Sequence, residues 1–107
     1  MKNYLGNAFS INMIMEMLEQ AEVTAVFKKV TMDEVSKADS TSVVGHPDTA
    51  AVLSNLLGKT VDFNRISVKL ESGSILYVAQ LEGGRLPEGA TTLPEGASFK
   101  FVRVTIL

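Results

Sequence analysis

The sequence has no cysteine and only one histidine. Without cysteine, a disulfide framework and a thiolate metal site are excluded, and a single histidine is too little for a His-rich metal centre within one chain. Apolar runs are also short, since the longest unbroken one, 75–79, is far below the roughly 20 residues that a membrane span needs. We therefore expect a cytoplasmic protein with no metal, no cofactor and no membrane partner.

An excess of positive charge is lacking as well. Ten Lys and Arg residues stand against twelve Asp and Glu residues, which gives a formal net charge of −2. A surface without broad positive charge does not follow a long polyanion through many phosphate contacts, so no DNA partner is expected. A compact anionic ligand needs only a local cluster of donors and is compatible with this balance.

The length of 107 residues, with 46% hydrophobic and 21% charged residues, is typical of a single globular domain over 1–107. Hydrophobic periodicity and turn-forming residues divide the chain into strands and helices. The predicted strands end near Leu5 and cover 23–31, 43–44, 66–70, 75–79 and 99–107. The predicted helices begin at Ser10, Thr31 and Pro47. The predicted fold class is therefore α/β, a single mixed sheet of about five strands with two or three helices and with 75–79 at its centre.

The segment around the single histidine is the most informative. The apolar pair 43–44 precedes Gly45 and His46, and apolar residues at helical spacing then run from Pro47 to Gly58. Proline is favoured at the first position of a helix and glycine just past the last, so both ends of this helix are marked. His46 is therefore expected at the helix N-cap.

The start of this helix predicts a phosphate pocket. Free backbone amides, the positive end of the helix dipole, the Thr49 hydroxyl and the His46 imidazole would surround one small volume. A carboxylate in the first turn repels an anion, so we expect the Asp48 side chain to point away. Histidine changes its charge nearest to neutral pH, which makes His46 the natural general acid or base; a capping or packing role is the alternative.

Other candidate residues each have a structural alternative. Arg85 follows two glycines that would let the backbone approach a ligand closely, which favours a phosphate clamp, although such loops are also common at solvated surfaces. Arg65 is more simply a charge at a strand end, Glu88 a solvated turn residue, and Ser10, with no adjacent His or Asp, a helix N-cap. The long irregular loop that contains Arg85 is typical of functional or mobile segments.

Four short motifs, taken together and in this order, resemble the viral anti-CRISPR ring nuclease family. They are the segment 7–13, Gly45-His46 with Thr49, Asn64-Arg65, and the segment 84–89. The family includes small proteins of archaeal viruses and bacterial phages, and relatives encoded beside type III CRISPR systems. The resemblance implies a homodimeric, metal-independent phosphodiesterase in the cytoplasm, or in the host cytoplasm if the protein is viral. It would bind cyclic tetra-adenylate and cut it to linear di-adenylate with a 2′,3′-cyclic phosphate, which suppresses type III CRISPR signalling.

The resemblance also implies roles for individual residues. His46 would protonate the leaving 5′-oxygen while the ribose 2′-hydroxyl attacks, Arg85 would stabilise charge on the phosphorane, and Glu88 would orient Arg85 or assist proton transfer. A second Leu-Pro-Glu-Gly motif makes Glu95 an alternative to Glu88. We favour Glu88, because only its motif follows Gly-Arg. The residues that would line the site are Asn7, Ser10, Asn12, Thr49, Arg65 and Gln80.

Two other functions remain open. One is a non-catalytic sponge that binds a cyclic oligonucleotide through the same donors without cutting it. The other is a small structural or regulatory dimer in which His46 is only a helix cap.

Overall fold

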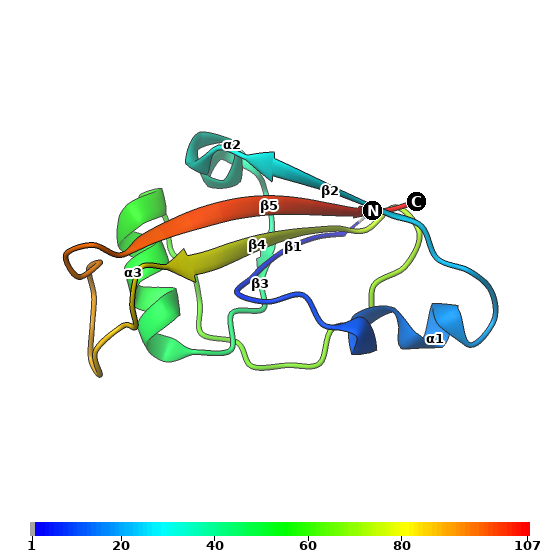
Figure 1. The fold of residues 1–107 in the computed structure, drawn as a ribbon, viewed down its shortest axis with the longest axis horizontal. Coiled ribbons are helices and arrows are strands. Elements are labelled where there is room, and N and C mark those ends of the chain that lie inside the picture. Colours follow the sequence, from blue (N-terminus) through cyan, green and yellow to red (C-terminus); the bar gives the residue numbers. More distant parts are fainter. Residues whose placement is uncertain (1) are drawn as a thin grey trace.

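The computed structural model describes residues 2–107 as one five-stranded sheet with helices packed on both faces (Figure 1). The elements in chain order are β1 (Asn3–Gly6), the 3-10 helix η1 (Ile11–Ile14), α1 (Met15–Leu18), β2 (Ala25–Val30), α2 (Met32–Lys37), β3 (Thr41–Ser42), α3 (Pro47–Leu57), β4 (Ile75–Glu82) and β5 (Ser98–Ile106). The expected α/β class with a single mixed sheet is confirmed. No helix within the described residues is both long enough and apolar enough to span a membrane.

The sheet is mixed, with strand order β2-β5-β4-β1-β3. β1 runs parallel to both β3 and β4, whereas β4 and β2 each pair antiparallel with β5. The central position predicted for the apolar segment 75–79 is confirmed, because β4 lies between β1 and β5 and its residues Leu76 to Ala79 are all buried. A strand covered on both faces loses the polar alternation of a half-exposed strand, which is why it is recognisable in the sequence.

Two hydrophobic clusters lie on opposite faces of the sheet, because successive strand residues point to opposite sides. On one face, α2 and α3 cover the alternate β4 residues Tyr77 and Ala79, with Leu53 of α3 fully buried. On the other face, Ile14 of η1 and Leu70 pack against Leu76 of β4. The sheet thus separates the helix that carries His46 from the N-terminal helical segment.

The strand predicted over 66–70 is wrong. Both hydrogen-bonding edges of β4 are occupied, by β1 and β5, so no position in the sheet next to β4 is left for this segment. It instead covers one face of the sheet, where Val68 and Leu70 are buried and the Leu70 N–H donates to the Met13 carbonyl at 2.7 Å. Burial alternates only from Val68 to Leu70, since Ile66 is exposed, and such a short alternation fits a covering segment as well as a strand.

The strand predicted at 43–44 is displaced towards the N-terminus. The paired residues are Thr41 and Ser42, and Val44 makes only an isolated bridge with Phe63. Val43 and Val44 are both buried, on the two opposite faces. They therefore anchor the segment that leads into α3.

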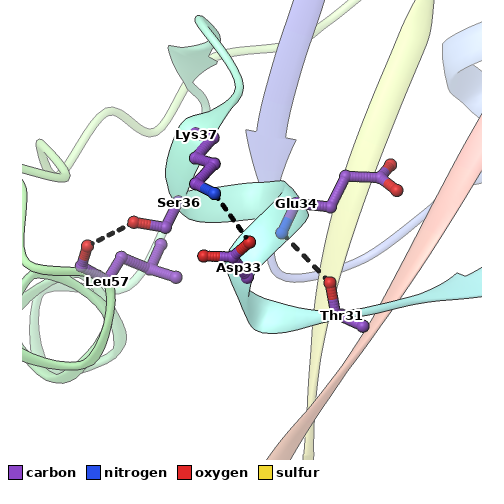
Figure 2. Close-up of polar contacts among 6 residues, drawn as sticks. All are labelled: Thr31, Asp33, Glu34, Ser36, Lys37 and Leu57. Carbon is purple, nitrogen blue, oxygen red and sulfur yellow. Dashed lines mark hydrogen bonds and ion pairs between the residues drawn. The ribbon is translucent and has the colours of Figure 1, made fainter.

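Helix α2 is held by its cap and by two neighbouring elements. The Thr31 hydroxyl accepts from the Glu34 N–H at 3.1 Å, as the capping pattern predicts, and the Ser36 hydroxyl donates to the Leu57 carbonyl of α3 at 2.6 Å (Figure 2). The Glu34 carboxylate does not return to the cap but accepts from Arg103 of β5. Lys59 completes the contact between α3 and α2 by donating to the Ala38 carbonyl.

Candidate functional site

Three candidate residues lie just beyond the carboxyl ends of three parallel strands. Asn7 follows β1, His46 lies a few residues after β3, and Arg85 lies shortly after β4. Because β1, β3 and β4 are mutually parallel, their carboxyl ends point in the same direction. Ligand sites of open α/β sheets form outside the carboxyl ends of parallel strands, and the topology places these three residues there.

His46 is the N-cap residue of α3, as predicted from Pro47 and Gly58. Its backbone is extended, with φ −137 and ψ 122, Pro47 begins the helix, and Gly58 ends it in the left-handed conformation with φ 66. The first bond of the helix runs from the Ala50 N–H to the His46 carbonyl at 3.0 Å. The imidazole makes no capping hydrogen bond and is exposed, so it is available to a ligand at the positive end of the helix dipole.

His46 and Arg85 line one hollow with Thr49, Leu81 and Leu86, of about 360 Å³. The size does not distinguish it, since other hollows on this chain measure about 400 to 430 Å³. Its chemistry does, because it combines the single histidine, an arginine and a threonine beside the free amides of a helix N-terminus. This arrangement can bind a phosphate group and transfer a proton to it.

Asn7 and Arg65 both contact Gly45, the residue before His46. The Gly45 N–H donates to Asn7 Oδ1 at 3.4 Å. A Cβ on Gly45 would lie 3.4 Å from Cγ of Arg65, so the aliphatic part of the Arg65 side chain packs against this glycine. Asn64 fixes the same segment through its N–H, which donates to the Val44 carbonyl at 2.8 Å. The motif Asn64-Arg65, distant in sequence, is thus adjacent to Gly45-His46.

Ser10 and Asn12 line a different hollow, together with Met13 and Ile66. The Ser10 hydroxyl accepts from the Asn12 N–H at 3.2 Å and caps η1, which confirms the capping prediction. The structure therefore does not bring these two residues into the hollow of His46. Ile66 lines this second hollow, and its sequence neighbour Arg65 packs against Gly45.

Gln80 is also outside the hollow of His46. It precedes Leu81 on β4, and adjacent strand residues point to opposite faces, so Gln80 and Leu81 face opposite sides of the sheet. Its side chain is exposed and donates to the Leu81 carbonyl at 3.2 Å.

Glu88 lies in the loop 83–97, which contains the sequence Leu-Pro-Glu-Gly-Ala twice. Each copy forms the same turn: the Ala90 N–H donates to the Pro87 carbonyl at 3.0 Å, and the Ala97 N–H to the Pro94 carbonyl at 3.1 Å. Gly89 and Gly96 occupy the positive-φ position of these turns. Glu88 itself is exposed and does not line the hollow of His46 and Arg85.

The first of these turns is attached to α3. Asp48 Oδ1 accepts from the Gly89 N–H at 3.2 Å, and the Asn55 side chain donates to the Thr91 carbonyl. Asp48 does not line the hollow, so its predicted orientation is confirmed. Its contact with the loop was not predicted, because nothing in the local sequence marks a bond between residues so far apart along the chain.

The fold and the site together define a small α/β protein with one mixed sheet, in which a histidine at a helix N-terminus and an arginine from a long loop share a hollow. Residues 3–98 match the model of the STIV B116-like family, and the chain belongs to this family. The solved structure of B116 of Sulfolobus turreted icosahedral virus has the same fold, with a TM-score of 0.75 and 23% sequence identity. The match covers 98% of this chain and 99% of that chain. A comparison with curated proteins finds no match.

Proposed function

We propose that the protein is a metal-independent ring nuclease that binds cyclic tetra-adenylate and cleaves it. The observation that carries the proposal is the shared hollow of His46 and Arg85 at the N-terminus of α3. The resemblance of the sequence motifs to anti-CRISPR ring nucleases supplies the substrate.

In the proposed reaction the substrate provides its own nucleophile. A ribose 2′-hydroxyl attacks the neighbouring phosphorus and loses its proton to solvent, the bond from phosphorus to the 5′-oxygen breaks, and a 2′,3′-cyclic phosphate is left. Protonated His46 gives its proton to the departing 5′-oxygen. The Arg85 guanidinium stabilises the charge that develops on the phosphorane, and donors fixed in advance around a reacting phosphate provide a large share of the rate enhancement.

The backbone of α3 contributes as well. Ala50 is the first residue whose N–H bonds within the helix, so the amides of Asp48 and Thr49 have no partner inside it. Together with the Thr49 hydroxyl they offer donors to phosphate oxygens. Glu88, three residues after Arg85 in the loop, would orient the guanidinium or assist proton transfer.

The proposal includes a homodimer. One chain carries one His46, and a ring of four nucleotides has two opposite bonds that two symmetric chains can each cut. Ser10, Asn12, Arg65 and Gln80 would then contact parts of the ligand away from the reacting phosphate.

Ring cleavage by the purified protein tests the proposal directly. Cyclic tetra-adenylate is incubated with the protein in the presence of a chelator, and the products are separated by chromatography. We expect linear di-adenylate from the wild type, and His46→Ala to bind the ring while cutting it about 100-fold or more slowly. Asp33→Ala, an exposed acidic residue in the first turn of α2, is the control and should cut normally.

The two alternatives predict different results. A sponge binds the ring and leaves it intact, with little change for His46→Ala. A regulatory dimer without a nucleotide site binds no ring at all. The capping role of His46 in α3 involves its backbone alone, and its imidazole makes no capping bond, so His46→Ala leaves the helix cap in place and tests the side chain by itself.

A further inference from the structure

We infer that Asp48 is a positioning residue, which holds the loop of Arg85 against α3 and thereby sets the guanidinium beside His46. This inference rests on the proposed function, and it assigns a role to a residue that touches neither the hollow nor the reacting atoms. It starts from the hydrogen bond between the Gly89 N–H and Asp48 Oδ1.

The loop 83–97 is closed tightly at its base. A Cβ on Gly83 would overlap the carbonyl oxygen of Gly96, so the two ends of the loop are in direct backbone contact. Beyond this base the chain extends away from β4 and β5 at the end of the sheet where α3 lies (Figure 1). The base therefore fixes where the loop begins, but not where its middle lies.

The chain after Arg85 makes more contacts that hold it in place than the chain directly before it. Gly84 directly precedes it, with φ 151, and a Cβ there would meet no atom within 4 Å, so no side-chain packing holds the chain immediately before Arg85. On the downstream side, the turn 87–90 is fixed by its internal bond and by Asp48. Among the hydrogen bonds of the described residues, the one between Gly89 and Asp48 is the nearest in sequence to Arg85 that reaches the helix carrying His46.

A second contact joins the same two elements. Asn55 lies two helical turns after Asp48, on the same side of α3, and its side chain donates to the Thr91 carbonyl. The loop therefore runs along one side of the helix. Asp48 holds the part next to Arg85, whereas Asn55 holds a more distant part.

The duplicated turn shows that this attachment is specific. Both copies of Leu-Pro-Glu-Gly-Ala have the same internal hydrogen bond and a glycine at positive φ. The carboxylate of Asp48 bonds to Gly89 of the first copy, while Gly96 of the second copy packs against Gly83. The turn that follows Arg85 is therefore the one attached beside His46, and this favours Glu88 over Glu95 for a role near the site.

Substitutions of Asp48 can separate the effect of its negative charge on ligand binding from the effect of its hydrogen bond to Gly89. A carboxylate in the first turn of α3 disfavours an anion bound at the same helix end. Asparagine keeps an oxygen that can accept from the Gly89 N–H but has no charge. Asp48→Asn should therefore keep kcat within about 3-fold and lower KM about 2-fold, since one unit charge several Å from a phosphate in water has a small effect. Asp48→Ala loses the acceptor, and we expect its kcat to fall about 100-fold, as for a misplacement of about 1 Å in a catalytic group.

The test compares kcat and KM for cyclic tetra-adenylate in Asp48→Ala, Asp48→Asn, Asn55→Ala and Asp33→Ala, with amide exchange of Gly89 measured by NMR. Asp48→Ala should lose both kcat and protection of the Gly89 amide, Asp48→Asn should keep both, and Asn55→Ala should lose less than 10-fold. Asp33→Ala should match the wild type. If the wild type cleaves the ring and Asp48→Ala keeps its kcat, or if Asn55→Ala is as impaired as Asp48→Ala, the inference is wrong while the proposed function stands. If the wild type leaves the ring intact, the proposed function fails first and the inference falls with it.

Discussion

Arg103 on β5 donates a hydrogen bond to Glu34 on α2, with 2.6 Å between Nη1 and Oε2. Directly opposite Arg103 on the neighbouring strand β4 is Tyr77, which is buried under the same helix. These contacts join α2, a helix of six residues, to the centre of the sheet.

The pair of Glu34 and Arg103 should contribute measurably to stability. The two side chains are 36% and 29% exposed, so solvent screens the pair only in part, and Glu34→Ala should lower the free energy of unfolding by about 1 kcal/mol. Asp33→Ala removes the neighbouring carboxylate from an exposed pair with Lys37 and should cost less than about 0.5 kcal/mol. Urea denaturation of both variants measures the difference, and equal midpoints would contradict the prediction.

Tyr77 should make the protein less stable at high pH. Burial, followed by the nearby Glu34 carboxylate, raises the pKa of the Tyr77 hydroxyl. Above the ordinary tyrosine pKa of about 10 the unfolded chain loses this proton while the folded chain keeps it, so the stabilising contribution, complete below pH 10, is lost as the pH rises through the folded pKa. Unfolding of Tyr77→Phe and wild type between pH 8 and about 11.5 checks this. We expect the wild type to lose more stability than the variant across that range, and parallel curves would refute the assignment.

The base of the long loop should not tolerate a side chain at Gly83. Gly83→Ala combines a positive φ of 82 with overlap against the Gly96 carbonyl, whereas Gly58→Ala has a positive φ of 66 but open space around the new methyl group. Gly58→Ala should cost about 1 to 2 kcal/mol from backbone strain alone. Gly83→Ala should cost about 1 to 3 kcal/mol more. Thermal melts of the two variants isolate the overlap, and a Gly83→Ala variant as stable as Gly58→Ala would show that the base of the loop is open.

The two arginines near His46 should have different kinetic effects in ring cleavage. Arg85→Ala removes a donor that acts on developing charge, so kcat should fall about 100-fold to 1000-fold. Arg85→Lys should recover only part of this loss, because an ammonium lacks the planar fork of a guanidinium. Arg65→Ala should mainly raise KM, since Arg65 packs on Gly45 and does not line the hollow. Steady-state kinetics distinguish the two, and a loss of kcat in Arg65→Ala equal to that of Arg85→Ala would contradict this division.

Features that depend on local chemistry were predictable from the sequence. The ends of α3 follow from Pro47 and Gly58, the cap of α2 from Thr31, and the central place of β4 from its unbroken apolar run. Features that depend on distant pairing were not. The alternation of 66–70 in the sequence indicates one buried and one exposed side, but Val68 and Leu70 bury theirs in a segment that lies across the sheet, and Ile66 is exposed.

In the candidate site, too, the features set by local sequence were predictable and those set by distant contacts were not. His46 and Thr49 follow from the helix start, and Arg85 from its loop, and the structure brings all three into one hollow. The resemblance alone placed Ser10, Asn12 and Gln80 in the site. Ser10 and Asn12 line another hollow beside η1, and Gln80 points to the face opposite Leu81, and no local motif specifies where these elements lie relative to α3. The bond between Asp48 and Gly89 connects residues 41 positions apart, and no local pattern specifies it.

Asn7, His46 and Arg85 are each carried by a separate connection after a different parallel strand. Lengthening a connection costs little free energy, since the closure entropy of a loop grows only slowly with its length. Each connection can thus change in length at little cost to the framework, whereas the hydrogen bonds of Asn7 with Gly45 and of Asp48 with Gly89 couple the positions of neighbouring connections. New ligand preferences are therefore accessible to this fold through changes that keep these two contacts.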